Sequence, residues 1–374
     1  MCEILDNKRV PISQKDRISG IYPYYGASGI VDYIDKYIFD EELVLIGEDG
    51  AKWDAFENSA FIASGKYWVN NHAHILKPNN EILINKFLVY FLNYSNLEKY
   101  ITGATVKKLN QQKLKQIEIP LPPLKEQERI VGILDESFAK IDESIKILEQ
   151  NLLNLDELMQ SALQKAFNPL KDNAKENYKL PQGWEWKSLG DISNYGKTSQ
   201  VKPSQLKGND WILELEDIEK ESGVLLQKVL FQDRQSKSNK IKFNKGDILF
   251  GTLRPYLKKV IIANDNGACS SEIMPFSTGN SIANHFIYYY LFANFLHDRI
   301  SSLTYGARMP RLGTKDGKSL QIPLPPLKEQ EQIAKHLDFV FEKTKALKEL
   351  YTKELKDYEE LKQSLLNKAF KGEL

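Results

Sequence analysis

An internal repeat constrains this chain more than any other feature of its sequence. The run Ile119-Pro-Leu-Pro-Pro-Leu-Lys-Glu-Gln-Glu128 recurs unchanged as Ile322-Pro-Leu-Pro-Pro-Leu-Lys-Glu-Gln-Glu331, an offset of 203 residues. The offset continues without a gap to Phe167 and Phe370, and 24 of the 49 aligned positions are identical. Upstream, further identities keep the same offset: Gly103-Ala104 on Gly306-Ala307, and Leu109 on Leu312. The chain is therefore a tandem duplication whose unit is a variable globular part followed by a shared C-terminal segment.

The shared segment predicts a long helix in each copy. Pro122 and Pro123 suit a helix that begins just after them, and a helix over about 124–167 would be roughly 65 Å long at ~1.5 Å per residue. Its apolar residues follow a heptad spacing: Leu134, Phe138, Ile141, Ile145, Leu148, Leu152, Leu155, Met159, Ala162 and Ala166. The copy over about 327–370 has a less regular seam, interrupted by polar Thr344 and Lys348: Leu337, Phe341, Leu347, Tyr351, Leu355, Tyr358 and Leu365. We expect the two helices to pack on each other as an antiparallel coiled coil related by a pseudo-twofold repeat.

The identical charged and glutamine residues at the helix starts have two interpretations. A coiled coil with no further role needs apolar spacing alone, so identity at polar positions favours a docking surface presented twice. The candidate docking residues are Leu124, Glu126, Gln127, Leu327, Glu329 and Gln330.

The fold class is predicted to be α/β, with two globular domains of short strands and helices. The expected limits are a first domain 1–119, a central repeat helix and linker 120–179, a second domain 180–322 and a C-terminal repeat helix 323–374. Expected strands include Leu43–Ile46, Ala60–Ala63, Asp247–Phe250, Val260–Ala263 and Glu272–Met274, with a hairpin-type turn at Asp265-Asn-Gly267. Expected helices are Asn85–Asn93 and His285–Leu296, and polar Asn168–Asn177 is the expected linker.

Composition excludes several classes of protein. Apolar residues are 42% of 374 and charged residues 27%, which is typical of a globular protein with a core. Two cysteines cannot form a disulfide framework, and the opening residues lack the apolar region of a signal peptide. No apolar stretch is long enough to span a bilayer. We expect a cytoplasmic protein.

No active site is evident in the sequence. The segment Gly190–Thr198 has five residues between its glycines where a phosphate-binding loop has four. His72 and His74 flank Ala73, but we expect polar-contact or solvent-facing histidines, because no nearby carboxylate or cysteine completes a ligand set. Hydrolase, zinc-protease and amino-methyltransferase motifs are absent from the sequence. We predict that the chain is not an enzyme, and that it binds no metal or cofactor.

Clusters of cations and aromatic residues indicate nucleic acid as a partner. The segment 180–322 has 19 Lys and Arg against 14 Asp and Glu, whereas 1–119 has 14 against 15. Arginine can donate two hydrogen bonds to guanine, and lysine can neutralise phosphate. The alternative is that the aromatic residues belong to the core and the cations to a solvated face. The candidate DNA-binding residues are Tyr24, Tyr25, Ser28, Lys52, Lys66, Tyr67, Asn70, Asn71, His72, Arg254, Tyr256, Lys258, Lys259, Ser270, Ser271, Arg308 and Arg311.

Several ordered motifs resemble those of one known family. Leu180-Pro-Gln-Gly-Trp-Glu-Trp-Lys-Ser-Leu-Gly-Asp191 is similar to the opening of a target recognition domain in the specificity (S) subunits of type I restriction-modification systems. The repeated Pro-Leu-Pro-Pro-Leu-Lys-Glu-Gln also resembles that family, and so do further motifs: Ile248–Leu257, Cys269–Glu272, Tyr22–Gly29, Leu45–Ala51 and Trp68–His74. The duplicated order of these motifs covers essentially the whole chain.

The resemblance implies a division of labour between subunits. Each recognition domain would bind one half of a two-part double-stranded DNA site, and the helices would set the gap between the halves. The helices would also dock two methyltransferase (M) subunits, which methylate adenine N6 with S-adenosylmethionine. Restriction (R) subunits would join to cut DNA with ATP and magnesium. The lack of catalytic motifs in this chain agrees with such a role.

The first domain departs from the family pattern. It has no counterpart of Gly183-Trp-Glu-Trp186, and Met1 begins where that opening would have ended. We therefore expect either a truncated first domain or one that completes its sheet in another way. The alternative function is a coiled-coil scaffold that binds a protein partner without DNA. A fused restriction-methylation enzyme would need a catalytic domain in the same chain.

Overall fold

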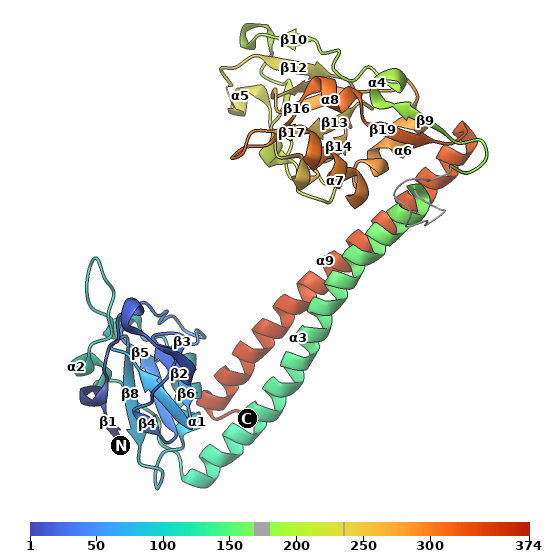
Figure 1. Ribbon diagram of the computed structural model, residues 1–374. Coiled ribbons are helices and arrows are strands. Elements are labelled where there is room, and N and C mark those ends of the chain that lie inside the picture. The colour runs from blue at the N-terminus through green and yellow to red at the C-terminus, as the bar shows by residue number, and fades with distance from the viewer. Residues whose placement is uncertain (168–179, 235) are drawn as a thin grey trace. The chain divides into compact units, whose positions relative to one another are not determined.

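The computed structural model describes residues 1–167, 180–234 and 236–374, and these residues form two compact units (Figure 1). Unit 1 comprises Met1–Glu149 and Thr352–Leu374, and unit 2 comprises Gln150–Tyr351. Each unit contains one globular part and one stretch of both long helices. The predicted linker Asn168–Asn177 lies outside the described residues, and the limits of the four predicted segments remain predictions.

The globular part of unit 1 is built on two four-stranded sheets with strand orders β1-β8-β5-β6 and β3-β2-β7-β4. Its elements are β1 (Cys2–Ile4), β2 (Ser19–Gly26), β3 (Gly29–Ile34), β4 (Phe39–Asp40), β5 (Leu43–Gly47), β6 (Ala60–Ala63), β7 (Lys66–Val69), β8 (Ala73–Pro78), α1 (Asn85–Tyr94) and α2 (Gln111–Leu114). The strand β1 pairs antiparallel with β8, so the first residues of the chain complete this sheet directly.

The strand β5 has all five residues buried because it lies between two cores. Val44 and Ile46 face one hydrophobic cluster, which includes α1 and both long helices. Leu43 and Leu45 face the other cluster, between the two sheets. Successive side chains of a strand point to opposite faces, so a continuous apolar run suits a strand covered on both sides.

Unit 2 repeats this arrangement around β13. Its strands are β9 (Glu185–Ser188), β10 (Gln200–Val201), β11 (Trp211–Leu213), β12 (Lys240–Phe243), β13 (Ile248–Gly251), β14 (Val260–Ile262), β15 (Gly267–Cys269), β16 (Ile273–Phe276), β17 (Thr304–Tyr305), β18 (Arg311–Leu312) and β19 (Gln321–Leu324). Its short helices are α4 (Leu189–Ile192), α5 (Phe231–Arg234), α6 (Ser281–Tyr290), α7 (Asn294–Leu303) and α8 (Thr314–Lys318). Ile248 and Phe250 face one core, while Leu249 faces another.

Two predictions about unit 2 are wrong. The turn at Asp265–Gly267 does not close a hairpin, because β14 pairs with β13 while β15 pairs with β11 and β12 in another sheet. The helix expected over His285–Leu296 is instead two helices, α6 and α7, with an interruption at 291–293. The Gln160 side chain of the long helix satisfies the backbone there: it accepts from Asn294 N at 3.1 Å and donates to Phe292 O at 3.3 Å. Because Gln160 pairs with Phe292 O and Asn294 N, the interruption between α6 and α7 leaves fewer backbone groups unpaired.

The two long helices have the predicted positions. They are α3 (Leu124–Phe167) and α9 (Leu327–Lys371), each beginning directly after a Pro-Pro pair. An acidic residue lies in each first turn (Glu126 and Glu329) and lysine in each last turn, which suits the helix dipole.

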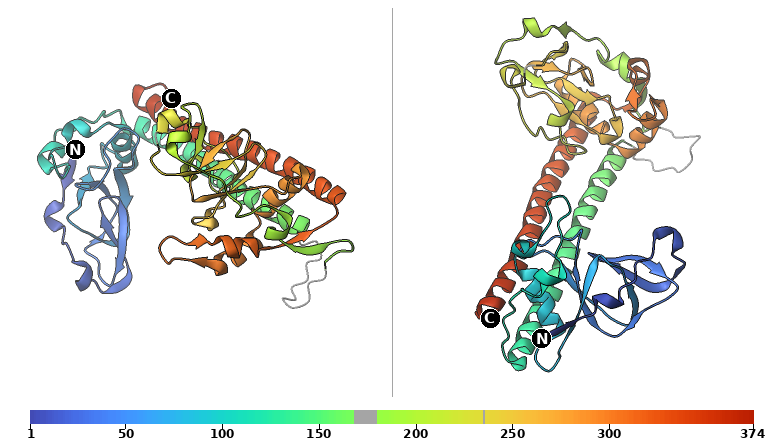
Figure 2. Two further views of the ribbon diagram at one scale, coloured as in Figure 1. Left: turned by 90° about the horizontal axis from the view of Figure 1, so that it is seen from above. Right: turned by 90° about the vertical axis from the view of Figure 1, so that its left-hand side faces the viewer.

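Within each unit, segments of α3 and α9 lie side by side and run antiparallel (Figures 1 and 2). In unit 1, Asp142 pairs with Lys362, and Arg129 donates to Leu374 O at 3.1 Å. In unit 2, Asp156 pairs with Lys348, while Leu163 and Phe167 share a core with Leu337. In both units higher residue numbers on α3 therefore face lower numbers on α9.

The seam of α9 follows the heptad through its polar residues. Thr344 is buried, and its hydroxyl donates to the Val340 carbonyl oxygen, while Lys348 pairs with Asp156 across the seam. Leu347 was predicted to lie in the seam but is 38% exposed, because it departs from the 3–4 spacing that Thr344 and Lys348 keep. Among the described residues, no helix is both long and apolar enough to cross a membrane.

Candidate nucleic-acid interface

Three loops meet at one end of the globular part of unit 2. They are the loop after β13 (252–259), the β15–β16 connection (270–272) and the β17–β18 hairpin (304–312). Thr252 N donates to Glu272 O at 2.8 Å, and Leu312 N donates to Thr252 O at 2.9 Å. Arg254 N donates to Pro310 O at 2.7 Å. These bonds hold predicted site residues from distant parts of the sequence in one place.

The arginines on these loops are available to a ligand. Arg254 and Arg308 are exposed and Arg311 is half-buried. Within the described part of the chain, none of the three guanidinium groups forms an ion pair with a carboxylate. Tyr256 and Tyr305 on the same loops are 49% and 60% exposed. Cations beside exposed aromatic rings are typical of nucleic-acid-binding surfaces.

The backbone of the 252–259 loop is strained. Arg254 and Lys258 have φ angles of 49° and 46°, in the left-handed region that non-glycine residues rarely adopt. Such conformations cost of order 1–3 kcal/mol each and persist where the surrounding structure enforces them. Here the Arg254–Pro310 hydrogen bond enforces the first of them. In this conformation the Arg254 side chain is exposed where the three loops meet.

Three predicted residues of unit 2 are turned away from this surface. Lys258 is buried and its ammonium group donates to Asn294 Oδ1; burial lowers its pKa, although nearby acidic groups oppose the shift. Lys259 Nζ donates to Leu215 O at 2.6 Å, and Ser270 is buried. Packing covers the side chains of Lys258 and Ser270 in this structure, and their role as DNA contacts stays a prediction. Ser271 remains exposed.

Unit 1 builds the same three-loop arrangement. Its loops are 48–54 after β5, 70–72 between β7 and β8, and 102–109. Glu48 N donates to His72 O at 2.8 Å, and Leu109 N donates to Glu48 O at 2.8 Å. These two bonds correspond to the Thr252–Glu272 and Leu312–Thr252 bonds of unit 2. The duplication therefore preserves the loop framework although the loop sequences differ.

The predicted residues of unit 1 divide into exposed and buried groups. The residues Ser28, Lys52, Lys66, Asn71 and His72 are exposed, and Tyr25 is half-buried. Tyr24, Tyr67 and Asn70 are buried. Tyr24 Oη accepts from Ile12 N at 3.0 Å, Asn70 Oδ1 accepts from His72 N at 2.8 Å, and Tyr67 stacks on Phe39. These three side chains are covered by packing in this structure, and their role as direct contacts stays a prediction.

The exposed residues of unit 1 are not all in one place. The turn that carries Ser28 lies against Gly47, where an added Cβ would be 2.9 Å from Ala27 O. Lys52 and His72 lie on the three loops, but Lys66 begins β7, at the end of that strand remote from 70–72. Lys66 is therefore separated from the meeting point of the loops.

The sequence-based prediction missed Lys107. It is exposed on the 102–109 loop and pairs with Glu98 at 3.2 Å. The repeat could have indicated Lys107, because Gly103-Ala104 aligns with Gly306-Ala307. This alignment places residues 105–108 opposite the arginine-rich residues 308–311. The neighbouring Lys108 is already engaged, with Glu48 at 2.7 Å and Asp49 at 3.9 Å.

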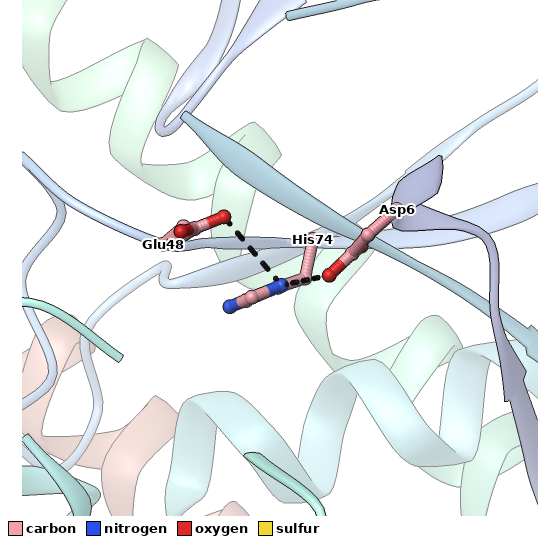
Figure 3. Close-up of side chains that lie close together, drawn as sticks. All are labelled: Asp6, Glu48 and His74. Carbon is pink, nitrogen blue, oxygen red and sulfur yellow. Dashed lines mark hydrogen bonds and ion pairs between the residues drawn. The ribbon is translucent and has the colours of Figure 1, made fainter. Parts of the chain in front are cut away.

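A buried ionic cluster lies beneath the loops of unit 1 (Figure 3). His74 Nδ1 is 2.6 Å from Asp6 Oδ2 and 3.7 Å from Glu48 Oε2, and Nε2 is 2.6 Å from Leu109 O. The expectation that no carboxylate lies near His74 is wrong, since Asp6 is 68 positions away in the chain but adjacent in the fold. The three side chains bring ligand atoms within 4.8 Å of one another, as a metal site requires.

The charges of this cluster are already balanced by protein groups. Glu48 pairs with Arg9 and Lys108, and Asp6 accepts from Ile75 N at 3.0 Å and from Gln111 Nε2 at 3.1 Å. Burial alone would raise the pKa of both carboxyl groups. The hydrogen bonds of Asp6 with His74 and Ile75 N, those of Glu48 with Lys108 and Arg9, and the nearby positive charge outweigh burial and lower each pKa. We interpret the cluster as a cross-link that fixes the N-terminal segment and the 102–109 loop to β8.

Replacement of Asp6 with Asn should destabilise unit 1. Removing one partner of a buried ionic group costs about 3–5 kcal/mol, so we expect faster hydrogen exchange at the β8 amides at pH 7. The Asp6 carboxylate contributes stability above its ordinary pKa of 3.8, and this is lost as pH falls through the lowered folded-state pKa. The difference between D6N and the parent should therefore vanish in strong acid. Asp32→Asn, at a more accessible, half-buried pair with Arg17, is the control and should change little.

The predicted docking residues at the helix starts also fall into a buried group and an accessible group. Gln127 is buried: its Nε2 donates to Ile82 O at 2.9 Å and Pro122 O at 2.8 Å, and its Oε1 accepts from Ile84 N at 3.0 Å. Gln330 is buried and donates to Pro325 O at 2.8 Å. The buried Gln127 joins the start of α3 to residues 82–84, and the buried Gln330 bonds to the residue that precedes its own helix. A docking role for the two glutamines stays a prediction. Leu327 is exposed, and Leu124, Glu126 and Glu329 are half-buried.

Replacement of Gln127 with Ala should cost about 2 kcal/mol of local stability, because three partly buried backbone groups lose their partner. The matched change Gln330→Ala removes the hydrogen bond to Pro325 O and should cost less. Hydrogen exchange at the starts of α1 and α3 would measure the first effect. Unchanged exchange in Q127A together with lost binding of a methyltransferase subunit would support a docking role for Gln127 instead.

Comparisons with known proteins bear on this arrangement. A family model described as the type I restriction modification DNA specificity domain matches residues 1–153 and 181–357. A Haemophilus influenzae protein described as a type I restriction enzyme specificity subunit is 30% identical over 344 residues, which cover 90% of this chain and 85% of that protein. The EcoDI specificity subunit of Escherichia coli is 26% identical over 381 residues, covering 95% and 83%.

Two solved structures share the fold. A chain from a structure on complex assembly of the type I R-M system superimposes with a TM-score of 0.70 at 19% identity, covering 100% of this chain and 98% of the other. The HsdS subunit of Thermoanaerobacter tengcongensis gives a TM-score of 0.54 at 19% identity, covering 100% and 97%. Both likenesses extend over the two units and the long helices.

Proposed function

The chain belongs to the family of type I restriction-modification DNA specificity proteins, as its motifs predicted, and from this premise we propose that each unit recognises one half of a two-part DNA site through its three loops. The chain is the specificity component of such a system and not its catalytic component. One observation carries the proposal: the same loop framework, closed by the same two backbone hydrogen bonds, occurs in both units.

The two units offer different chemistry to DNA. In unit 2, Arg254, Arg308 and Arg311 can donate to guanine O6 and N7 or to phosphate, and exposed Tyr256 and Tyr305 can pack against sugar or base. In unit 1, the loops carry Asn71 and His72, suited to base edges, and Lys52 and Lys107, suited to phosphate. The carboxylates of Glu48 and Asp49 offset this positive charge. Unit 2 therefore supplies the larger electrostatic part of the affinity.

Membership of the family supports two further kinds of partner, methyltransferase (M) subunits and restriction (R) subunits. We propose that two methyltransferase subunits dock near the helix starts, where Leu124, Glu126, Leu327 and Glu329 are at least partly accessible. The long helices would set the distance between the two half-sites, since a rigid element fixes spacing better than a flexible linker. S-adenosylmethionine, ATP and magnesium would be bound by the partner subunits, with no cofactor in this chain.

Genome-wide mapping of N6-methyladenine tests the proposal. The chain would be co-expressed with its neighbouring methyltransferase subunit in a host free of adenine methylation. A two-part motif with a fixed gap is the expected result. A motif from one half alone would contradict a role for both units in recognition.

Salt dependence separates this function from the scaffold alternative. A DNA-binding specificity subunit should shift a cognate duplex in a gel, with affinity that falls steeply as salt rises, because cationic side chains release counterions from phosphate. A scaffold that binds only protein should give no shift at any salt concentration. Binding without salt dependence would contradict the assigned cations.

A further inference from the structure

The third loop of each unit is the same backbone hairpin. In unit 1, Thr102 N donates to Lys108 O at 2.9 Å, and Lys108 N donates to Thr102 O at 2.8 Å. The repeat offset of 203 residues places these two residues on Tyr305 and Arg311, which are antiparallel partners in the β17–β18 hairpin of unit 2. Each hairpin therefore presents an equivalent tip, at 103–107 and at 306–310.

A glycine shapes each tip in the same way. Gly103 and Gly306 have φ angles of 96° and 91°, in the left-handed region that favours glycine. A Cβ added to Gly103 would be 2.1 Å from Val106 O, and one added to Gly306 would be 3.1 Å from Met309 O. In both tips the glycine thus lies against the carbonyl group of the residue three positions later. Val106 and Met309 occupy matching places in the two hairpins.

The residue at this place is apolar and exposed in both units. Val106 is 66% exposed and Met309 is 52% exposed. Exposed cations adjoin them in the chain, Lys107 after Val106 and Arg308 before Met309. A single exposed hydrophobic residue is ordinary on a protein surface. Here, however, the apolar character recurs at one position of the repeat although the residue itself has changed.

In unit 1, Val106 lines a hollow between two of the three loops. The hollow has a volume of about 390 Å³ and lies between residues 50–54 and 105–107. Its lining includes one aromatic residue, two cations and two carboxylates: Trp53, Lys52, Lys107, Asp54 and Glu98. The Glu98 carboxylate is already paired with Lys107 at 3.2 Å. The Val106 side chain therefore borders space that a group from outside the protein can enter.

We propose that Val106 and Met309 each contact the C5-methyl group of a thymine in the half-site that its unit recognises. This inference rests on the proposed function. The thymine methyl is the apolar group that base pairs present in the major groove, and apolar side chains recognise it by contact. The neighbouring lysines and arginines suit phosphates and base acceptors. The two apolar residues are thus specificity-determining residues that select an A·T pair.

Replacement of thymine with deoxyuridine tests the contact, because it removes only the methyl group. Each thymine of the cognate duplex, taken from the methylation map, would be replaced in turn. The full chain in complex with its methyltransferase subunits would be titrated by fluorescence anisotropy. One deoxyuridine in each half-site should weaken binding by about three- to fourfold, as expected for one methyl group.

Variants of the chain assign each contact to its residue. Met309→Ala should lose a similar factor on the thymine duplex and should no longer respond to deoxyuridine at the sensitive position of its half-site. Met309→Leu, which keeps an apolar side chain, should keep that response. Val106→Ala should reduce the response in the other half-site. Leu226→Ala is the matched control, since Leu226 is 58% exposed in unit 2 outside the three loops; it should behave like the parent.

The failure of this inference is distinct from the failure of the proposed function. Specific binding of the cognate duplex without a response to any deoxyuridine would overturn the methyl contacts and leave DNA recognition in place. A response that persists unchanged in Met309→Ala and Val106→Ala would assign the thymines to other residues and so overturn the inference as well. Equal affinity for cognate and altered duplexes would overturn both the inference and the proposed function.

Discussion

Removing the three unpaired arginines of unit 2 should lower affinity for the cognate duplex by about a hundredfold or more. Each arginine that donates to a base edge contributes about 1–3 kcal/mol of discrimination. The loop hydrogen bonds place Arg254, Arg308 and Arg311 together, and their guanidinium groups have no carboxylate partner among the described residues. Arg254 should be changed to Gly, which tolerates its φ of 49°, and the other two to Ala.

The measurement is a titration of duplex by fluorescence anisotropy at several salt concentrations, with the methyltransferase complex. A matched triple change of Lys202, Lys207 and Lys242 to Ala removes the same charge from exposed sites in unit 2 outside the three loops. If arginines contact bases, the loop variant loses discrimination between cognate and altered duplexes, while the control loses little affinity. Equal losses in the two variants would show that net charge alone matters, and that the loop assignment is wrong.

Replacement of Asp217 with Asn should destabilise unit 2 by about 3–5 kcal/mol. Asp217 is fully buried and accepts from Arg234 at 2.5 and 2.8 Å, from Glu214 N at 2.8 Å and from Gln227 at 2.8 Å. Removing its charge leaves the half-buried Arg234 guanidinium without its main partner. The same turn supplies Leu215 O, which accepts from Lys259 Nζ and so holds the base of the 252–259 loop.

Both stability and DNA binding should therefore respond to D217N. Urea unfolding followed by hydrogen exchange at β11 and β13 would measure the stability. Burial alone would raise the Asp217 pKa, but the bonds from Arg234 and its other donors lower it. Its contribution is thus present above the ordinary pKa of 3.8 and lost as pH falls through the lower folded-state pKa. Asp265→Asn, at an exposed pair with Lys228, is the control; equal behaviour of both variants at pH 7 would contradict the prediction.

The repeat by itself determined the largest features of this protein. The heptad spacing and the Pro-Pro pairs located both long helices to within a residue, because helix ends and buried stripes are local properties of sequence. The continuous apolar runs located β5, β6 and β13 for the same reason. The ordered, duplicated motifs identified the family, which the comparisons confirm.

Only the tertiary structure decided which candidate side chains are exposed. Tyr24, Tyr67, Asn70, Lys258 and Ser270 have the residue types of a binding surface, but strand pairing and long-range packing bury them. The same packing placed Asp6 beside His74 and turned Gln127 inward, since both contacts join residues more than 40 positions apart. Local pattern gives the elements and the faces that are apolar. Which polar groups end up beneath those faces depends on sheet order and loop closure, which no local pattern encodes.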